Sequence, residues 1–184
     1  MNISHTLFTA RPNCTGRLDK EKAVYALLDS LSIPYTGCDH EHADTIEQCR
    51  AVEAVLGVEI CKNLFLANTQ GTVFHLLLMP GDKKFKTKDF SKQIGSARLS
   101  FGDAGHLLEY LDITPGSVSV LGLMNDREHH VALHIDRELL SDEYIGCHPC
   151  INTSTLKLRL TDITEKLLPH LGYTLSVVDL PRYE

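Results

Sequence analysis

The stretch Glu59–Met79, EICKNLFLANTQGTVFHLLLM, contains two apolar runs, Leu64–Ala67 and Thr72–Met79, on either side of a polar segment that ends in glycine. This pattern predicts a β-hairpin. Side chains alternate between the two faces of a strand, so Lys62 shares a face with Leu64, and that face is expected to be buried. An inward lysine indicates either an ammonium that reaches the rim of the sheet or a site for an anionic ligand.

The remaining sequence alternates between helical and strand patterns. Helices are predicted over 20–32, from the capping box Thr45-x-x-Gln48 to Leu56, over 88–94, from Asp103 to Leu111, and from Asp162 to Leu171. Strands are predicted over 97–101, 129–136, 154–160 and 173–180, with a turn that enters a strand at 113–123. The class is mixed α/β. No repeat or linker interrupts the chain, so one domain over residues 1–184 is expected.

The composition favours a cytoplasmic enzyme or binding domain. No apolar run reaches the ~20 residues that cross a bilayer, and the start lacks the layout of a signal peptide. A net charge of −6 argues against bulk coating of nucleic acid. The stretch 82–98 is nevertheless basic and can meet phosphates, through candidate tRNA contacts at Lys83, Lys84, Lys86 and Lys88.

Six cysteines raise the alternative of a zinc or thiol protein. Cys147-His-Pro-Cys150 has the spacing of zinc and redox motifs. A structural zinc site needs a second ligand pair, and the stretch 38–42 suits a strand or loop better than a ligand knuckle. A redox motif should open a helix, whereas a strand pattern follows here. We therefore expect no metal and no cofactor.

Three short stretches carry residue types that suit ligand binding. The first is Lys62 with Asn63. The second is the turn at Pro115-Gly116, where glycine lets the backbone approach a ligand and free N–H groups can bind an oxyanion. The third is His148, whose backbone is biased toward an extended conformation because proline follows it. Each signal alone also fits an ordinary surface turn or core residue.

Together these stretches resemble a known family. KNLFL after a helix that ends in VLG, then ARLSFGDAGHLLEYLDITPGSVSVLGLMND, HPCINTST and a closing VVDL are similar to the YbaK/ProX family, over residues 17 to 180. These proteins are aminoacyl-tRNA deacylases related to the editing domain of bacterial prolyl-tRNA synthetases. The resemblance implies a strongly curved mixed β-sheet surrounded by helices. It also implies hydrolysis of alanine wrongly attached to tRNA(Pro), with prolyl-tRNA synthetase as a further candidate partner.

The resemblance also implies roles for residues of this chain. Lys62 would hold the phosphate or ribose of the terminal adenosine, Gly116 would present backbone amides to the ester carbonyl, and His148 would shape the pocket by contacting the amino group or the attacking water. No nucleophilic side chain is required, because the ribose hydroxyl of the substrate positions water in this family. The residues expected to contact substrate are Thr45, Asn63, Ser117, Ser119 and Asn152.

One departure and two alternatives remain. The family loop usually reads G-x-x-x-P-F-G, whereas this chain has valine at position 120, which leaves the loop less stiff than a proline would. A loop weakened in this way would suit a tRNA-binding or synthetase-binding module that has lost catalysis. Removal of cysteine rather than alanine from the same tRNA, as in YbaK itself, is the other alternative.

Overall fold

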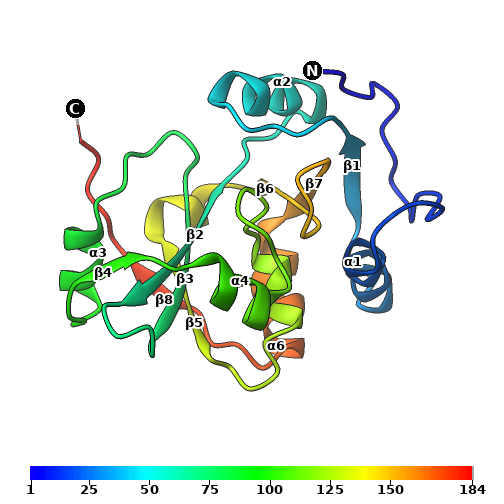
Figure 1. Cartoon of the computed structure of the whole chain (residues 1–184). Helices are drawn as coiled ribbons and strands as arrows, with labels where there is room; N and C mark the ends of the chain where they lie inside the picture. The colour runs from blue at the N-terminus through cyan, green and yellow to red at the C-terminus, as the bar shows by residue number, and fades with distance from the viewer. Residues whose placement is uncertain (184) are drawn as a thin grey trace.

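The computed structural model describes residues 1–183, apart from the side chain of Ile46. Its larger sheet has five strands in the order β4-β2-β3-β5-β8 (Figure 1). They are β2 (Lys62–Asn68), β3 (Phe74–Met79), β4 (Leu99–Phe101), β5 (Val131–Asp136) and β8 (Ser176–Val178). β2 pairs antiparallel with β3 and β4, whereas β5 pairs parallel with β3 and β8. The sheet is therefore mixed, as predicted.

The predicted hairpin is confirmed as β2 and β3, with Leu64 opposite Leu77. The side chain of Asn68 organises the connection, because its Oδ1 accepts hydrogen bonds from the N–H groups of Thr72 and Val73. An asparagine that bonds the following backbone in this way is a common cause of a tight turn.

A second sheet contains three antiparallel strands in the order β1-β7-β6. They are β1 (Tyr35–Asp39), β7 (Ser154–Arg159) and β6 (Tyr144–Cys147). A parallel bridge between Ile60 and Gly146 joins the two sheets just before β2. A Cβ atom at position 146 would lie 3.1 Å from the carbonyl oxygen of Glu59, so glycine permits this close approach. The strands expected in one sheet are thus divided between two sheets that meet at this bridge.

The helices lie around the sheets (Figure 1). They include α1 (Asp19–Ser30), α2 (Ile46–Leu56), α3 (Thr87–Gln93) and α4 (Ala104–Leu111). The capping box of α2 is confirmed: Gln48 N–H donates to Thr45 Oγ1 at 3.2 Å, and Gln48 Oε1 accepts from Thr45 N–H at 3.0 Å. Gly57 ends α2 in the left-handed conformation, and Asp103 caps α4. No helix among residues 1–183 is long and apolar enough to cross a membrane.

Both faces of the larger sheet are covered. Leu76 and Leu78 of β3 belong to the main core, which also contains residues of α1 and the smaller sheet. Leu77 and Met79 face the other way and pack in a second cluster with Phe90 of α3. Every residue of β3 is buried as a result. This strand is almost entirely apolar, with His75 as its one polar side chain, because it has no solvent face.

Two predicted elements differ from the structure. Residues 113–123 form no strand: the turn at Pro115-Gly116 leads to a 3-10 helix, η1 (Val120–Met124), whose N-cap Ser119 accepts from Leu121 N–H. The last helix begins at Leu160 rather than Asp162 and is composed of α5 (Leu160–Asp162), the π-helical η3 (Ile163–Leu167) and α6 (Leu168–His170). The alternation of Val118 and Val120 suited a strand, but the local capping contact determines the backbone instead.

Candidate functional site

A cavity of about 640 Å³ lies along the edge of β2 that faces away from β3. Alternate residues of a strand direct their N–H and C=O groups to the same edge. Cys61 N–H donates to the Gly146 carbonyl at 3.0 Å, and the Phe65 carbonyl accepts from Gly102 N–H at 2.9 Å. Between them, the backbone N–H and C=O of Asn63 have no partner within residues 1–183. The cavity is therefore placed where the edge of β2 is left open, between β6 and β4.

The cavity wall brings together five of the predicted site residues from distant parts of the chain. Residues of the N-terminal end of α2, of β2, of the loop before η1 and of the end of β6 contribute to it. The five are Thr45, Lys62, Asn63, Gly116 and His148. Ser117, Ser119 and Asn152 are buried next to this wall rather than in it.

Lys62 lies half-buried in the wall, so its side chain is neither in the core nor free at the rim. Its Nζ donates to the backbone carbonyl of Lys83 at 2.7 Å. An ammonium has three N–H donors, and the other two have no partner in the described part of the chain. Burial lowers the pKa of Lys62, while the nearby carboxylate of Asp82 acts in the opposite direction. The side chain is thus held at one point, with donors left for an anionic or polar ligand.

Asn63 connects β2 to the loop that follows the glycine turn. Its Oδ1 accepts from Val120 N–H at 2.9 Å, and its Nδ2 donates to the Cys61 carbonyl at 3.2 Å. Valine at position 120 therefore holds the loop to β2 by a contact that the expectation of a weaker loop did not include. Val120 is fully buried, and its N–H makes a bond that proline cannot make. The amide of Asn63 is used inside the protein and positions the loop.

The turn before η1 has the geometry that its sequence predicts. Ser117 N–H donates to the Thr114 carbonyl at 3.1 Å, and Gly116 has φ +89°. Pro115 then occupies the second and Gly116 the third position of a type II turn, where a positive φ is required. The N–H groups of Gly116 and Val118 have no acceptor among the residues described. This turn can therefore offer backbone donors to an oxygen atom in the cavity.

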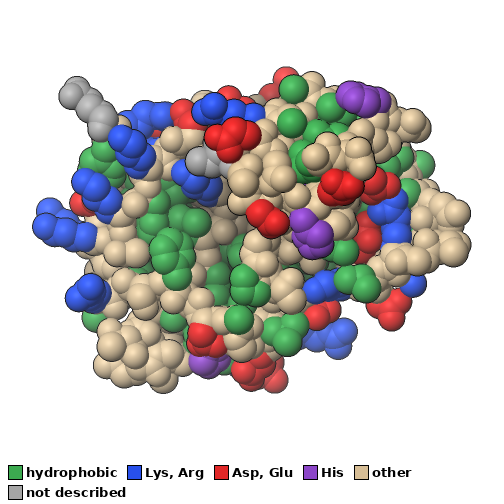
Figure 2. Space-filling view, turned by 45° about the horizontal axis from the view of Figure 1, so that its top comes forward, with side chains coloured by type: hydrophobic (Ala, Val, Ile, Leu, Met, Phe, Trp, Pro, Cys, Tyr) green, Lys and Arg blue, Asp and Glu red, His purple; other side chains and the backbone are tan. Residues whose placement is uncertain are grey.

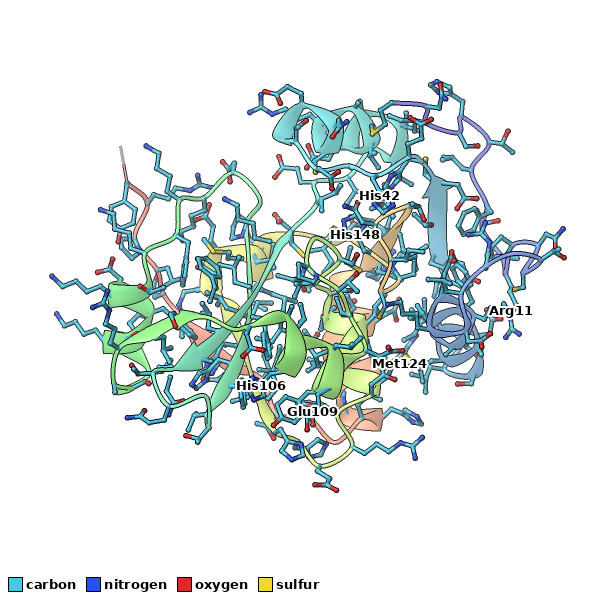
Figure 3. All side chains as sticks on the ribbon, viewed as in Figure 1. Arg11, His42, His106, Glu109, Met124 and His148 are labelled. Carbon is cyan, nitrogen blue, oxygen red and sulfur yellow. The ribbon has the colours of Figure 1, made fainter. Side chains whose placement is uncertain are left out.

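His148 follows β6 and is buried at the cavity, beneath α2 (Figure 3). Its Nδ1–H donates to the Ser154 carbonyl at 2.9 Å and lies 3.3 Å from Thr155 Oγ1. Burial lowers the pKa of His148, so the ring is neutral at pH 7. A neutral ring that carries its proton on Nδ1 keeps a lone pair on Nε2. His148 can thus accept a hydrogen bond from a group in the cavity.

Behind this ring lies His40, which the sequence did not single out as a site residue. Its Nε2 lies 2.8 Å from Thr155 Oγ1 and its Nδ1 lies 2.7 Å from the Glu41 carbonyl. Both nitrogens therefore have partners and neither is free for a metal. Among the described residues, no group of three or more His, Cys, Asp or Glu side chains is arranged to hold a metal ion.

Thr45 and Asn152 hold the segment before α2 against the cavity. Thr45 caps this helix, as described above, and Asn152 Oδ1 accepts from Ala43 N–H at 3.2 Å. Asn152 Nδ2 lies near Gly116, 3.6 Å from where a Cβ would be. The two residues act on the shape of the wall. The side chains of both residues are hydrogen-bonded to other groups of the protein.

The thiols at the cavity are poor nucleophiles. Cys61 and Cys147 line the wall and are free cysteines. Burial raises the pKa of Cys61 to about 12 and raises that of Cys147 as well. Cys150 is also buried, and burial raises its pKa to about 12. A protonated thiol attacks esters poorly and binds metals poorly.

The basic stretch must be revised at one residue. Lys83 is only 2% exposed, and its Nζ forms ion pairs with Asp136 at 2.7 Å and Glu138 at 3.0 Å. The prediction that Lys83 contacts tRNA is therefore wrong, because its ammonium is inside the protein. Lys84, Lys86 and Lys88 are exposed. The pattern of alternating lysines did not reveal that one of them turns inward to Asp136.

The sequence also missed two contributions to the wall. Asp82 lies at the cavity and is held by Arg182, 100 residues away, at 2.9 and 3.0 Å. Phe101 lies at the cavity although it is exposed. The sequence predicted a strand over 97–101, and no local signal showed that β4 ends at an opening.

Comparison with known proteins gives a consistent result. A family model described as an aminoacyl-tRNA editing domain matches residues 40–166. The chain is 34% identical over 163 residues to the prolyl-tRNA editing protein ProX of Acetoanaerobium sticklandii, covering 89% of this chain and 99% of that protein. It is 29% identical over 142 residues to prolyl-tRNA synthetase associated domain-containing protein 1 of Xenopus laevis, covering 75% and 84%. A crystal structure described as a candidate trans-editing enzyme for prolyl tRNA synthetase shares the fold, with a TM-score of 0.63 at 14% identity over 89% of this chain and 99% of that one.

Proposed function

Because the chain belongs to the aminoacyl-tRNA editing domain family, which includes YbaK and ProX, we propose that it is a trans-editing deacylase. Its substrate is tRNA(Pro) that carries alanine, and the reaction is hydrolysis of the ester between the amino acid and the terminal ribose. The observation that supports this most directly is the single cavity that combines Lys62, the Gly116 turn and His148. We place the reaction in the cytoplasm, in a single domain, next to prolyl-tRNA synthetase.

The cationic side of the cavity suits the nucleotide end of the substrate. Lys62 keeps two N–H donors beyond its contact with the Lys83 carbonyl. A phosphate or ribose oxygen would accept these bonds, and a charge-assisted bond of this kind is worth about 1.5–3 kcal/mol. The fixed Nζ defines how far the ester can enter the cavity.

The glycine turn suits the ester carbonyl. As water attacks, negative charge develops on the carbonyl oxygen, and donors aimed at it stabilise that charge. The unpaired N–H groups of Gly116 and Val118 are the candidates. Asn63 holds this loop to β2, so the donors and Lys62 are kept at a constant separation. Preorganisation of this kind lowers the barrier without any reorganisation during the reaction.

His148 suits the amino group or the attacking water. Its Nε2 accepts a hydrogen bond from either, since Nδ1 is committed to Ser154. The thiols in the wall do not act as nucleophiles because burial keeps them protonated. Water is therefore the nucleophile, positioned by the ribose hydroxyl of the substrate.

Selectivity follows from the size of the amino acid. A synthetase site built for proline cannot strongly exclude alanine, so a second site must remove the error. Here the pyrrolidine ring would be excluded by overpacking, at a cost of about 1–3 kcal/mol.

The test is single-turnover deacylation of tRNA(Pro) esterified with alanine, cysteine, serine or proline. We expect rapid release of alanine and slow release of proline. Faster release of cysteine would favour the YbaK-type activity, and no release from any ester would favour a binding module.

A further inference from the structure

Phe101 is a large aromatic side chain left in solvent at the mouth of the cavity. It is 65% exposed, more than any other large hydrophobic side chain in the described part of the chain. It lines the cavity that contains Lys62. Exposed phenylalanine at a cavity mouth costs solubility, and it is often retained where a ligand covers it.

The position of this ring is well defined. Phe101 ends β4, where it is paired with Leu66 of β2. Its ring packs in an edge arrangement with the ring of Phe85, with the ring centroids 6.3 Å apart and the planes at 62°. One side of the ring is thus supported by protein while much of its surface is open. A fixed and open aromatic surface can stack on a flat ligand.

The surroundings of Phe101 favour a negatively charged partner. Lys88, Lys92 and Arg98 are exposed on α3 and on the segment that leads into β4. The acidic residues of the same stretch are engaged elsewhere: Asp82 with Arg182, and Asp89 with the hydroxyl of Tyr183. Figure 2 shows lysine and arginine side chains gathered at this end of the molecule beside a hydrophobic patch. The chain as a whole has a net charge of −6, so the positive charge is concentrated in this region rather than spread over the protein.

We propose that Phe101 is the stacking platform for the terminal base of the single-stranded RNA end, an inference that rests on the proposed function. Phe101 lies opposite Leu66, four residues along β2 from Lys62, which corresponds to about 13 Å. This spacing suits a base on Phe101, with the ribose and its ester nearer to Lys62. Proteins that bind single-stranded nucleic acid combine such aromatic surfaces with basic residues that follow the backbone. A second copy of this chain fits less well, because it would bring the same lysines together.

The experiment uses an uncharged RNA hairpin with a single-stranded 3′ end whose terminal adenine is replaced by 2-aminopurine. Fluorescence of this base falls when it stacks, so binding is measured without any ester. The variants are Phe101→Leu, which keeps an apolar side chain, and Phe101→Trp, which keeps an aromatic one. Val73→Ala is the matched control, because Val73 is also exposed but does not line the cavity.

The wild type, Phe101→Trp and Val73→Ala proteins should quench the fluorescence with similar affinity. Phe101→Leu should bind about 5- to 150-fold more weakly, which corresponds to a stacking contribution of ~1–3 kcal/mol. Wild-type affinity and quenching in Phe101→Leu would overturn the proposal. So would a wild type that does not quench but forms a dimer that Phe101→Leu dissociates, since Phe101 would then be a protein interface. If the wild type quenches but releases no amino acid from any tRNA(Pro) ester, the proposed deacylase activity fails while the stacking platform stands.

Discussion

Replacing Val120 by proline tests whether the loop of the candidate site is held by one hydrogen bond. Val120 N–H donates to Asn63 Oδ1 at 2.9 Å, and proline has no N–H. The backbone otherwise suits proline. Val120 is the first residue of the 3-10 helix η1, and Ser119 before it is extended, with φ −150° and ψ 144°, as a residue before proline must be. The substitution therefore removes the bond with little change in backbone conformation.

The expected effect is destabilisation. Leaving the partly buried acceptor of Asn63 without its donor costs up to about 1–3 kcal/mol. A compatible proline stabilises by only ~0.4–1 kcal/mol through the unfolded state. The lost bond is the larger effect, so the net loss should be about 1–2 kcal/mol. For a chain of this size, the melting temperature should fall by roughly 2–8 °C. Deacylation should also slow, because Asn63 no longer holds the loop that carries Gly116 to β2.

The assay is a double-mutant cycle with Val120→Pro, Asn63→Ala and the combined variant. Thermal unfolding and single-turnover deacylation of Ala-tRNA(Pro) are measured for each. Once Asn63 has lost its amide, the N–H of Val120 has no partner to lose, so proline should cost less in that background. A Val120→Pro protein as stable and as active as the wild type would refute this reasoning. Purely additive losses would also refute it.

Three further predictions concern other parts of the site and core. Lys62→Ala should reduce catalytic efficiency about tenfold to hundredfold, through loss of a contact worth ~1.5–3 kcal/mol, and leave the melting temperature nearly unchanged; unchanged deacylation by the folded variant would exclude this role. Joint replacement of Cys147 and Cys150 by alanine should leave deacylation within a fewfold of wild type, whereas zinc in the purified protein and inactivation by a chelator would contradict it. Burial, together with the charge of nearby His75, lowers the pKa of His134 to about 4, so the unfolded chain binds this proton first as the pH falls from 6.5 toward 4. The free energy of unfolding should therefore decrease across this window by up to about 3 kcal/mol, and His134→Asn should make this decrease smaller. The free energy is measured by denaturant titration at several pH values, and an equal dependence on pH in both proteins would count against the prediction.

Local patterns were sufficient for much of the fold. The hairpin, the capping box of α2, the glycine that ends it and the cap of α4 were all predicted, because each depends on residues a few positions apart. The strand predicted over 113–123 was wrong because the local pattern there was misleading. Its alternating valines suited a strand, but a serine cap and the amide of distant Asn63 favour a 3-10 helix.

The sequence by itself determined which residues have chemistry to offer: Lys62 on an otherwise apolar strand face, Gly116 in a Pro-Gly turn, and His148 before a proline. Only the tertiary structure decided that they lie together in one cavity. The opening in the edge of β2 exists because Gly146 of β6 bonds Cys61 and Gly102, just after β4, bonds Phe65, and no local pattern encodes which strands meet there. Likewise, Lys83 and Lys84 are adjacent and identical in sequence, yet Lys83 is buried because Asp136 and Glu138 lie within 3.0 Å of its ammonium. Charge and burial depend on neighbours that only the folded chain brings together.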